Sequence, residues 1–264
     1  MSAIRLSAVE FLNARPLVYG LEKHPDLFAL KFDVPSKCAA ALHEGAVDLG
    51  LIPSIEYLQR PDYHVVPDIA VASSGPVASV ALFSQRPATA IRSIATDSNS
   101  RTAVALLRIL CAEWFDISPT FVKMRPDLSP MLRRCDAALL IGDRALFTEH
   151  ETVGLEKIDL GEEWRAMTAL PFVWAFWVGR PGCVEPSHVE ALQAARSQGI
   201  AALDEIADRF APPDEDDAAE IARAYLHDNV GYSLDDQGLA GLKKFYDSAA
   251  DLRVVPASGK LRFY

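Results

Sequence analysis

The chain has 264 residues, half of them hydrophobic, which is enough to bury a large core in one domain or in two modest lobes. Its formal net charge of −10 argues against nucleic acid and anionic membranes as main partners, because both bind basic surfaces. A small anionic ligand remains compatible with this charge, because a few arginines and helix N-termini can make one pocket positive.

No stretch near the start has the pattern of a signal peptide, and no window approaches the apolar length of a membrane span, so we expect a cytoplasmic protein. The four cysteines are widely spaced, without a C-x-x-C pair or zinc-ligand spacing. We therefore expect reduced thiols and no metal site. No glycine-rich phosphate loop occurs, which argues against nucleotide binding.

Strand and helix patterns alternate in the first third of the chain. Strands are predicted over 4–9, 28–34 and 47–52, and they alternate with helices over 16–23 and 35–43 and a helix that starts at 53–54. Such alternation is typical of βαβ units in a mainly parallel sheet. Two extended segments, 65–73 and 77–84, follow.

A second alternation then begins. Its predicted strands cover 93–96, 120–123 and 137–141, and its predicted helices cover 102–115 and 128–134. An aromatic-rich strand over 170–178 comes next. Three helices end the chain, at about 186–209, 214–227 and 234–250. Apolar residues recur in them every three to four positions.

This order predicts an α/β protein of two lobes, each a mainly parallel sheet flanked by helices. We assign 1–84 plus 178–264 to the first lobe and 85–177 to the second. The chain then crosses twice, near 80–83 and near 172–178, and these two crossing strands make a hinge around a cleft. Ligands of open parallel sheets lie at the carboxyl ends of the strands, so the turns after the strands are the candidate site.

The turn Asp97-Ser98-Asn99-Ser100-Arg101-Thr102 lies between a strand and a long helix. Its hydroxyls and the first backbone N–H groups of the helix suit a carboxylate, although Ser98 or Ser100 could simply cap the helix. We take Ser100, Arg101 and Thr102 as substrate-binding candidates.

The first turn reads FLNARP, with Asn13 and Arg15 before or within a helix that Pro16 opens. Asn13 either caps that helix or offers its amide to a ligand. Arg15 either pairs with a ligand carboxylate or lies in solvent.

Four further substrate-binding candidates follow predicted strands or lie near a crossing: Ser54, Ser79, Gly142 and Asp143. The hydroxyl of Ser79 faces either the cleft or another strand. Asp143 is a cap, a ligand contact or a latch between the lobes that pairs with an arginine. The aromatic run 172–177 reads as core, although its alternation could turn one ring toward a ring-shaped ligand.

Several stretches together resemble the chorismate dehydratases of the futalosine route to menaquinone. These are FLNARPLVYGL (11–21), VDLGLIPSIEY (47–57), GPVASVALFS (75–84), ATDSNSRTAVALLRILC (95–111), CDAALLIGDRALF (135–147) and LPFVWAFWVGR (170–180). They span nearly the whole chain in order. The resemblance implies the two-lobed fold of type II periplasmic binding proteins.

The resemblance also implies that the protein removes water from chorismate, a dicarboxylate, to give 3-[(1-carboxyvinyl)oxy]benzoate without a metal or redox cofactor. It implies Asn13 as the catalytic residue at the reacting proton. A neutral amide is a poor base, so Asn13 would orient the substrate while a substrate carboxylate or a water takes the proton.

Two alternatives remain. The first is the sister enzyme of this pathway and fold, which forms 1,4-dihydroxy-6-naphthoate and uses a histidine in the second lobe. Here the only second-lobe histidine is His150, in a polar stretch. The second is a non-catalytic binding protein for small acids on the same fold, because a fold does not by itself imply catalysis.

Overall fold

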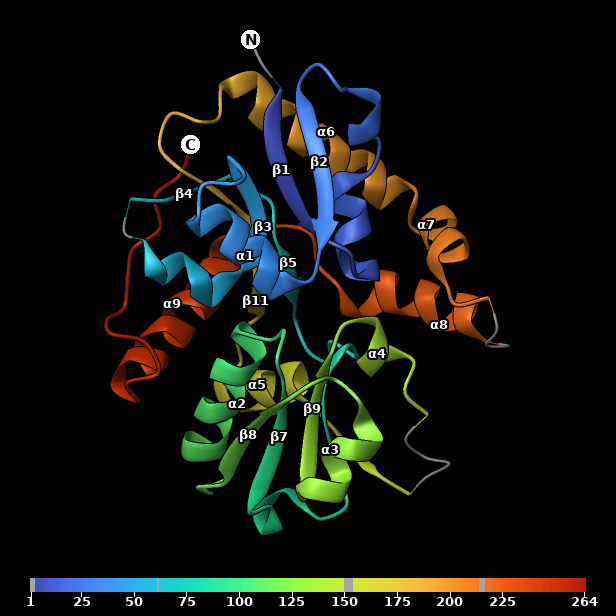
Figure 1. Ribbon diagram of the computed structural model, residues 1–264, viewed down its shortest axis with the longest axis vertical. Helices are drawn as coiled ribbons and strands as arrows, with labels where there is room; N and C mark the ends of the chain where they lie inside the picture. The colour runs from blue at the N-terminus through green and yellow to red at the C-terminus, as the bar shows by residue number, and fades with distance from the viewer. Residues whose placement is uncertain (1–2, 61, 150–153, 214–216) are drawn as a thin grey trace.

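The computed structural model of the protein describes residues 3–60, 62–149, 154–213 and 217–264. The described strands form two separate sheets, each with helices packed around it, and Figure 1 shows one sheet above the other. Both chain ends lie with the first sheet, where Phe263 bridges to Val65. The C-terminal helices thus return to the sheet that the N-terminus begins.

The first sheet contains the three parallel strands of the predicted βαβ units. Across the sheet the order is β2 (Phe28–Asp33), β1 (Ile4–Val9), β3 (Leu49–Pro53), β11 (Phe172–Gly179) and β4 (His64–Val65), and β5 (Val71–Ser73) also pairs with β11. β1 is parallel to β2 and β3. β11 is antiparallel to β3, β4 and β5.

The second sheet has five strands. Their order is β10 (Glu156–Asp159), β6 (Val80–Ser84), β9 (Ala137–Ile141), β7 (Ser93–Asp97) and β8 (Thr120–Met124). β7 is parallel to β8 and β9, whereas β6 is antiparallel to β9 and β10. Both sheets are therefore mixed, and not mainly parallel as predicted. The reason is that β6 and β11 enter their sheets from the boundary between them, whereas the βα strands run toward it.

The hydrogen bonds also place these two strands across the predicted lobe boundaries. β6 belongs to the second sheet and β11 to the first, so the chain passes between sheets at 74–79, which we call the first crossing segment, and at 169–171. The division into two lobes stays a prediction, with its crossings moved to these segments.

The helices fill the connections. Around the first sheet lie η1 (Leu12–Val18), η2 (Leu21–Lys23), α1 (Pro35–His43), η3 (Ser54–Gln59), α6 (Pro186–Ala201), α7 (Leu203–Phe210), α8 (Ala218–Ala224), the π-helix η5 (Tyr225–Asn229) and α9 (Asp236–Asp251). Around the second lie η4 (Ala88–Ala90), α2 (Thr102–Glu113), α3 (Leu128–Arg134), α4 (Asp143–Leu146) and α5 (Leu160–Thr168).

Two helix predictions need correction. The helix predicted over 16–23 is two 3₁₀ turns, η1 and η2, because Gly20 between them adopts a left-handed φ of 76°. The helix predicted over 186–209 is broken at Ala202 into α6 and α7, and both pieces pack on η1. Neither β10 nor α5 is predicted by the sequence pattern. Residues 214–216 of the next predicted helix lie outside the described residues.

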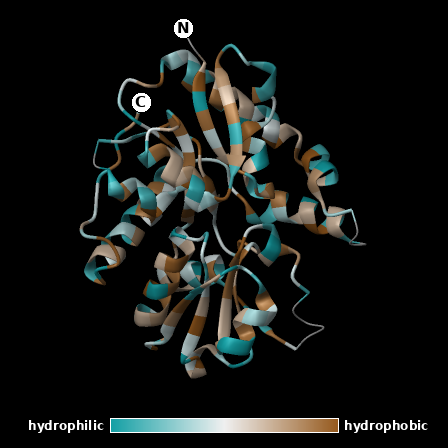
Figure 2. Ribbon diagram, viewed as in Figure 1, coloured by the Kyte–Doolittle hydropathy of each residue, from teal (hydrophilic) through white to brown (hydrophobic). Residues whose placement is uncertain are grey.

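The core is built from alternating strand residues. On β6, Val80 and Leu82 join the large cluster of apolar side chains that also fills the first sheet, whereas Ala81 and Phe83 join a smaller cluster under α3. Both faces of the second sheet are thus covered. Figure 2 shows hydrophobic residues along its strands. The carboxyl ends of β1, β3 and β9 meet at the boundary between the sheets, and the cavity described next lies there.

Candidate active site

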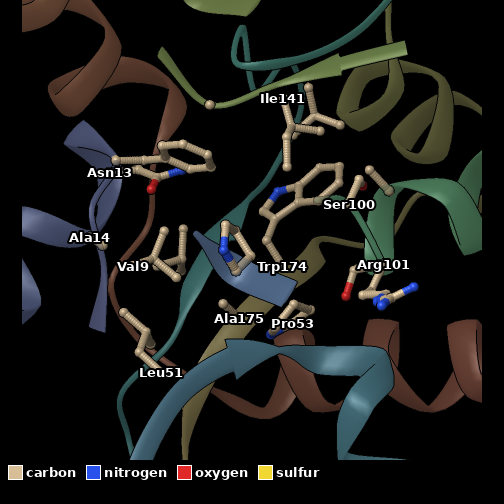
Figure 3. A pocket seen from close by; sticks show the side chains of 17 residues that line it. Val9, Asn13, Ala14, Leu51, Pro53, Ser100, Arg101, Ile141, Trp174 and Ala175 are labelled. Atoms are coloured by element: carbon tan, nitrogen blue, oxygen red, sulfur yellow. The ribbon is translucent and has the colours of Figure 1, made fainter. Parts of the chain in front are cut away.

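A cavity between the two sheets is enclosed by residues of both (Figure 3). It holds about 540 Å³ of space, part of which is open solvent. Its walls are mainly apolar. The lining residues are Val9, Phe11, Asn13, Ala14, Pro35, Leu51, Pro53, Val71, Val80, Ser100, Arg101, Thr102, Ala103, Ile141, Gly142, Trp174 and Ala175.

Asn13 reaches the cavity because the chain turns sharply after β1. The cap position of η1 is Phe11, whose backbone is extended, and no side chain caps this helix. Asn13 is therefore not the cap that one interpretation of the sequence proposed. It lies inside the 3₁₀ turn and lines the cavity on the side opposite Ser100 and Arg101 (Figure 3).

The N-terminus of α2 forms the facing wall. Its cap position is Arg101, no side chain caps it, and Ser100, Arg101 and Thr102 all line the cavity. The structure thus differs from the interpretation of Ser98 or Ser100 as a cap. The first N–H groups of a helix lack partners within the helix and carry partial positive charge, so this wall suits an anion.

Asp97, whose carboxyl group is buried, stabilises the turn before α2. Asp97 accepts a hydrogen bond from the Asn99 N–H at 2.8 Å, and its own carbonyl accepts from the Ser100 N–H. Burial raises the pKa of the Asp97 carboxyl, while the Asn99 hydrogen bond and the charge of Arg144 lower it.

The hydroxyls of Ser54 and Thr102 form hydrogen bonds within the protein at the boundary between the two sheets. Thr102 Oγ1 accepts from the Ile55 N–H at 3.2 Å and lies 3.4 Å from Ser54 Oγ. Ser54 Oγ donates to the Val173 carbonyl at 2.8 Å and is fully buried, so Ser54 supports the cavity from behind and is not among the residues that line it. Arg101 forms an ion pair with Glu56 of η3 at 3.5 Å.

Gly142 and Asp143 connect the second sheet to the first turn. The Asp143 carboxylate accepts a hydrogen bond from the Leu12 N–H at 2.9 Å. A Cβ atom on Gly142 would lie 2.6 Å from the Phe11 ring. Gly142 lines the cavity, whereas Asp143 does not. Asp143 forms a latch to the first turn, but its hydrogen-bond partner is the backbone of Leu12 and not the arginine that one interpretation of the sequence proposed.

We expect Asp143 to make the free energy of unfolding depend on pH. Burial raises the pKa of Asp143, while the Leu12 N–H and Arg15 lower it. The folded state then binds more protons than the unfolded state, so this group's contribution to stability decreases as pH rises from its unfolded value through its folded value. Asp143→Asn can still accept from Leu12, and we expect its stability relative to the wild type to increase over that window. Urea unfolding of both proteins from pH 4 to 7 measures this.

Asp136→Asn is the matched control. The backbone N–H groups of Arg92 and Ser93 bind the Asp136 carboxylate, and the hydrogen bond from Arg92 is the largest cause of its lowered pKa. The stability that this group contributes is lost as pH falls, so the variant's relative stability should change in the opposite direction. Parallel curves for wild type and Asp143→Asn would contradict the raised pKa of Asp143.

Ser79 lies behind the cavity wall at the end of the first crossing segment. It is fully buried, its hydroxyl accepts a hydrogen bond from the Tyr225 phenol at 2.7 Å, and its carbonyl accepts from the Gly142 N–H. It therefore faces another chain segment, and among the described residues it connects the crossing segment to η5 and to β9.

Arg15 lies neither in the cavity nor free in solvent. Its guanidinium stacks between the rings of Phe32 and Phe210, 4.5 and 4.3 Å from their centres, and donates to the Glu10 carbonyl. Desolvation lowers the pKa of Arg15. This arginine thus fastens η1 to β2 and α7.

Three residues of the site have no assigned role in the sequence prediction. Trp174 lines the cavity and donates to Ser73 Oγ at 3.1 Å; it is the ring that the alternation of the aromatic run turns inward. Asp159 binds the first crossing segment. An aspartate three positions before a glutamate is a helix-start signal, and the pair Asp159 and Glu162 could have indicated this residue. Tyr225 had no such signal, because a tyrosine in an amphipathic helix reads as core.

The sequence predicts reduced thiols and no metal site, and the sister-enzyme alternative needs a histidine in the second lobe. All four cysteines are free. In the described parts of the chain, no three His, Cys, Asp or Glu side chains gather as metal ligands do. His150, on which the sister-enzyme alternative depends, lies outside the described residues.

The sequence comparisons identify the family. A family model described as menaquinone biosynthesis matches residues 4–251. The chain belongs to this menaquinone-biosynthesis family. The family predicted from the motifs is thereby confirmed. A relative of this family member, the chorismate dehydratase of Thermus thermophilus, is 30% identical over 270 residues, covering 89% of this chain and 95% of that protein.

Solved structures confirm the predicted fold of this family member. A protein from Archaeoglobus fulgidus superposes with a TM-score of 0.73 at 17% identity, over 96% of this chain and 98% of that one. The periplasmic aliphatic sulphonate binding protein of Escherichia coli superposes with a TM-score of 0.64 at 17% identity, over 100% and 92%. Of the helices in the described ranges, none is long and apolar enough to cross a membrane.

Proposed function

We propose that the protein is a chorismate dehydratase, which removes water from chorismate to give 3-[(1-carboxyvinyl)oxy]benzoate in the cytoplasm. The family and the dehydratase of Thermus thermophilus support this proposal. The observation that carries it is the cavity itself, where the amide of Asn13 faces an uncapped helix N-terminus across mainly apolar walls. This arrangement suits a ring-shaped dicarboxylate.

The reaction makes modest chemical demands. A ring C–H bond breaks and its proton leaves, while the ring hydroxyl departs with its bonding electrons and becomes water after protonation. Formation of the aromatic ring drives both steps. The N-terminus of α2 would hold one substrate carboxylate, and the amide of Asn13 would orient the ring. A substrate carboxylate or a water would take the proton, because an amide is not a base at neutral pH.

Contacts between the two sheets would keep bulk water from this chemistry. Phe11 against Gly142, Leu12 with Asp143, and Arg101 with Glu56 all join residues of different sheets around the cavity. Substrate entry then requires these contacts to open, and their closure would complete the site.

Asn13→Ala is expected to lower kcat for chorismate dehydration by about 100-fold, as the loss of one positioned polar group does in comparable sites. The assay follows chorismate and product by chromatography and mass, since the product is lighter by one water. Asn99→Ala is the matched control: this asparagine lies in the turn before α2 but is not among the residues lining the cavity, and its turnover should equal that of the wild type.

Each outcome separates one alternative. Equal turnover by wild type and Asn13→Ala would keep the reaction and remove Asn13 from it. Chorismate that is bound and returned unchanged by folded wild type would contradict the proposal and favour a binding protein. Formation of 1,4-dihydroxy-6-naphthoate from the sister enzyme's own substrate would favour that enzyme.

A further inference from the structure

Three consecutive residues at the start of η3 contact the N-terminus of α2. The Ile55 N–H donates to Thr102 Oγ1 at 3.2 Å, and Ser54 Oγ lies 3.4 Å from the same hydroxyl. The Glu56 carboxylate pairs with the Arg101 guanidinium at 3.5 Å. Because η3 follows β3 of the first sheet and α2 follows β7 of the second, these contacts join the two sheets beside the cavity.

Glu56 is itself held on the side of the first sheet. Its second carboxylate oxygen lies 3.0 Å from His43 Nε2, and His43 Nδ1 lies 3.0 Å from the Tyr63 phenol. A carboxylate has no proton to give, so we assign the ring hydrogen to Nε2, which donates to Glu56.

The third member of this chain supports the same direction. Tyr63 is buried, and burial raises its pKa, so its phenol keeps its proton at neutral pH. In the neutral imidazole of His43 the phenol then donates to Nδ1. The two rings also stack, with centres 5.7 Å apart and 5° between their planes. The Glu56 carboxylate is therefore oriented by the first sheet before it meets Arg101.

The guanidinium of Arg101 points away from the middle of the cavity. In Figure 3 its nitrogen atoms lie on the side away from Trp174. The Arg101 side chain is 44% exposed and that of Glu56 only 13%. Within the described ranges, Arg101 has no other ion-pair partner, and no hydrogen bond holds its guanidinium. This geometry suits an anchor for the start of α2 better than a ligand contact.

We propose that Glu56 is a positioning residue and that Arg101 is its anchor, so that this ion pair holds the N-terminus of α2 at the cavity, where the helix N–H groups bind a carboxylate of chorismate. The inference rests on the proposed function. In it the Arg101 guanidinium does not touch the substrate, although the sequence marks this arginine as a substrate-binding candidate. Molecules with α2 displaced would not bind, so the ion pair raises the apparent affinity by raising the binding-competent fraction.

Glu56→Gln is expected to raise KM for chorismate about three- to fivefold, while kcat changes less than about twofold. The amide oxygen can still accept from His43, but the neutral side chain no longer attracts Arg101. The sign of the change is informative, because removing a negative charge near an anion site would by charge alone lower KM. Steady-state kinetics measure both constants. A merely structural role would lower the melting temperature and leave KM unchanged, which would overturn the inference.

Arg101→Ala and the double variant Glu56→Gln/Arg101→Ala test whether the pair acts as a unit. Arg101→Ala should raise KM by about the same factor as Glu56→Gln, and the double variant by no more than either. A guanidinium that binds the substrate predicts another pattern. Arg101→Ala would then weaken binding far more than Glu56→Gln, which would lower KM by freeing the arginine. That pattern, or factors that multiply in the double variant, would overturn the inference.

Glu113→Gln is the matched control. Glu113 lies at the other end of α2, pairs with Lys244 of α9 at 3.9 Å and is not among the residues lining the cavity. The variant removes a comparable ion pair between a helix of each sheet, so its KM should equal that of the wild type. A rise equal to that of Glu56→Gln would show a general loosening of α2 and would contradict a specific role of Glu56.

Glu56→Asp keeps the test independent of the folding of Glu56→Gln. It retains the charge but is one methylene shorter, too short to reach both His43 and Arg101, so KM should rise here as well. Wild-type KM in this variant would overturn the inference. Each of these failures leaves the function in place as long as the wild type dehydrates chorismate. Wild type without dehydratase activity overturns the function and the inference together.

Discussion

Asp159→Ala is expected to lower the free energy of unfolding by about 3–5 kcal/mol, because one buried carboxylate holds four backbone N–H groups that would lose their acceptor. Its Oδ1 accepts from Val77, Gly161 and Glu162 at 3.0, 2.8 and 3.1 Å, and its Oδ2 accepts from Ala78 at 2.6 Å. Asp159 thus caps the N-terminus of α5 and also holds the first crossing segment in place. Ala78 has a left-handed φ of 58°, a conformation that needs such support.

Asp159→Asn is the graded control for this prediction. Its amide oxygen can replace Oδ1, but its NH₂ group would face the Ala78 N–H, so we expect a loss of about 1–2 kcal/mol. Urea unfolding followed by circular dichroism measures both variants. A loss below about 1 kcal/mol for the alanine variant would show that water or another group satisfies these N–H donors.

Gly142→Ala is expected to lower kcat/KM for the proposed reaction on the order of 100-fold. Gly142 has φ 65° and ψ −151°, a backbone conformation open essentially only to glycine. Its added Cβ would also lie 2.6 Å from the Phe11 ring, which belongs to the other sheet. The variant therefore strains its own loop and pushes the two walls of the cavity apart.

Two comparisons separate these effects. Gly182→Ala places a Cβ at φ 74° with no atom within 4 Å, so it carries the cost of a positive φ without a clash and should retain turnover. Adding Phe11→Leu to Gly142→Ala makes room for the Cβ and should recover part of kcat/KM. Steady-state kinetics with chorismate measure all three. No recovery in the double variant would assign the loss to the backbone alone, and wild-type turnover by Gly142→Ala would contradict the close contact.

Local patterns in the sequence predicted most regular elements closely. The predicted bounds 4–9, 35–43 and 137–141 match β1, α1 and β9, because hydrophobic periodicity and proline positions act within a few residues. The turns after these strands were therefore also placed correctly. Of the predicted site residues, Asn13, Ser100, Arg101, Thr102 and Gly142 line the cavity.

The elements that differ are those whose conformation depends on distant contacts. β10 is short and mostly polar, and it is a strand because it pairs with β6. The break between α6 and α7 at Ala202 carries no breaker residue, and both helices pack on η1. At Gly199 in α6 an added Cβ would meet the backbone of Pro16, so a long-range approach constrains this helix as well.

The sequence by itself determined the strands, the helices and the turns that could carry a site. Only the tertiary structure decided which side chains meet there. Ser79 and Tyr225 are 146 positions apart, and Leu12 and Asp143 are 131 apart. Their pairing depends on how two sheets and a returning C-terminal segment bury one another, and no periodicity within a single element encodes that packing.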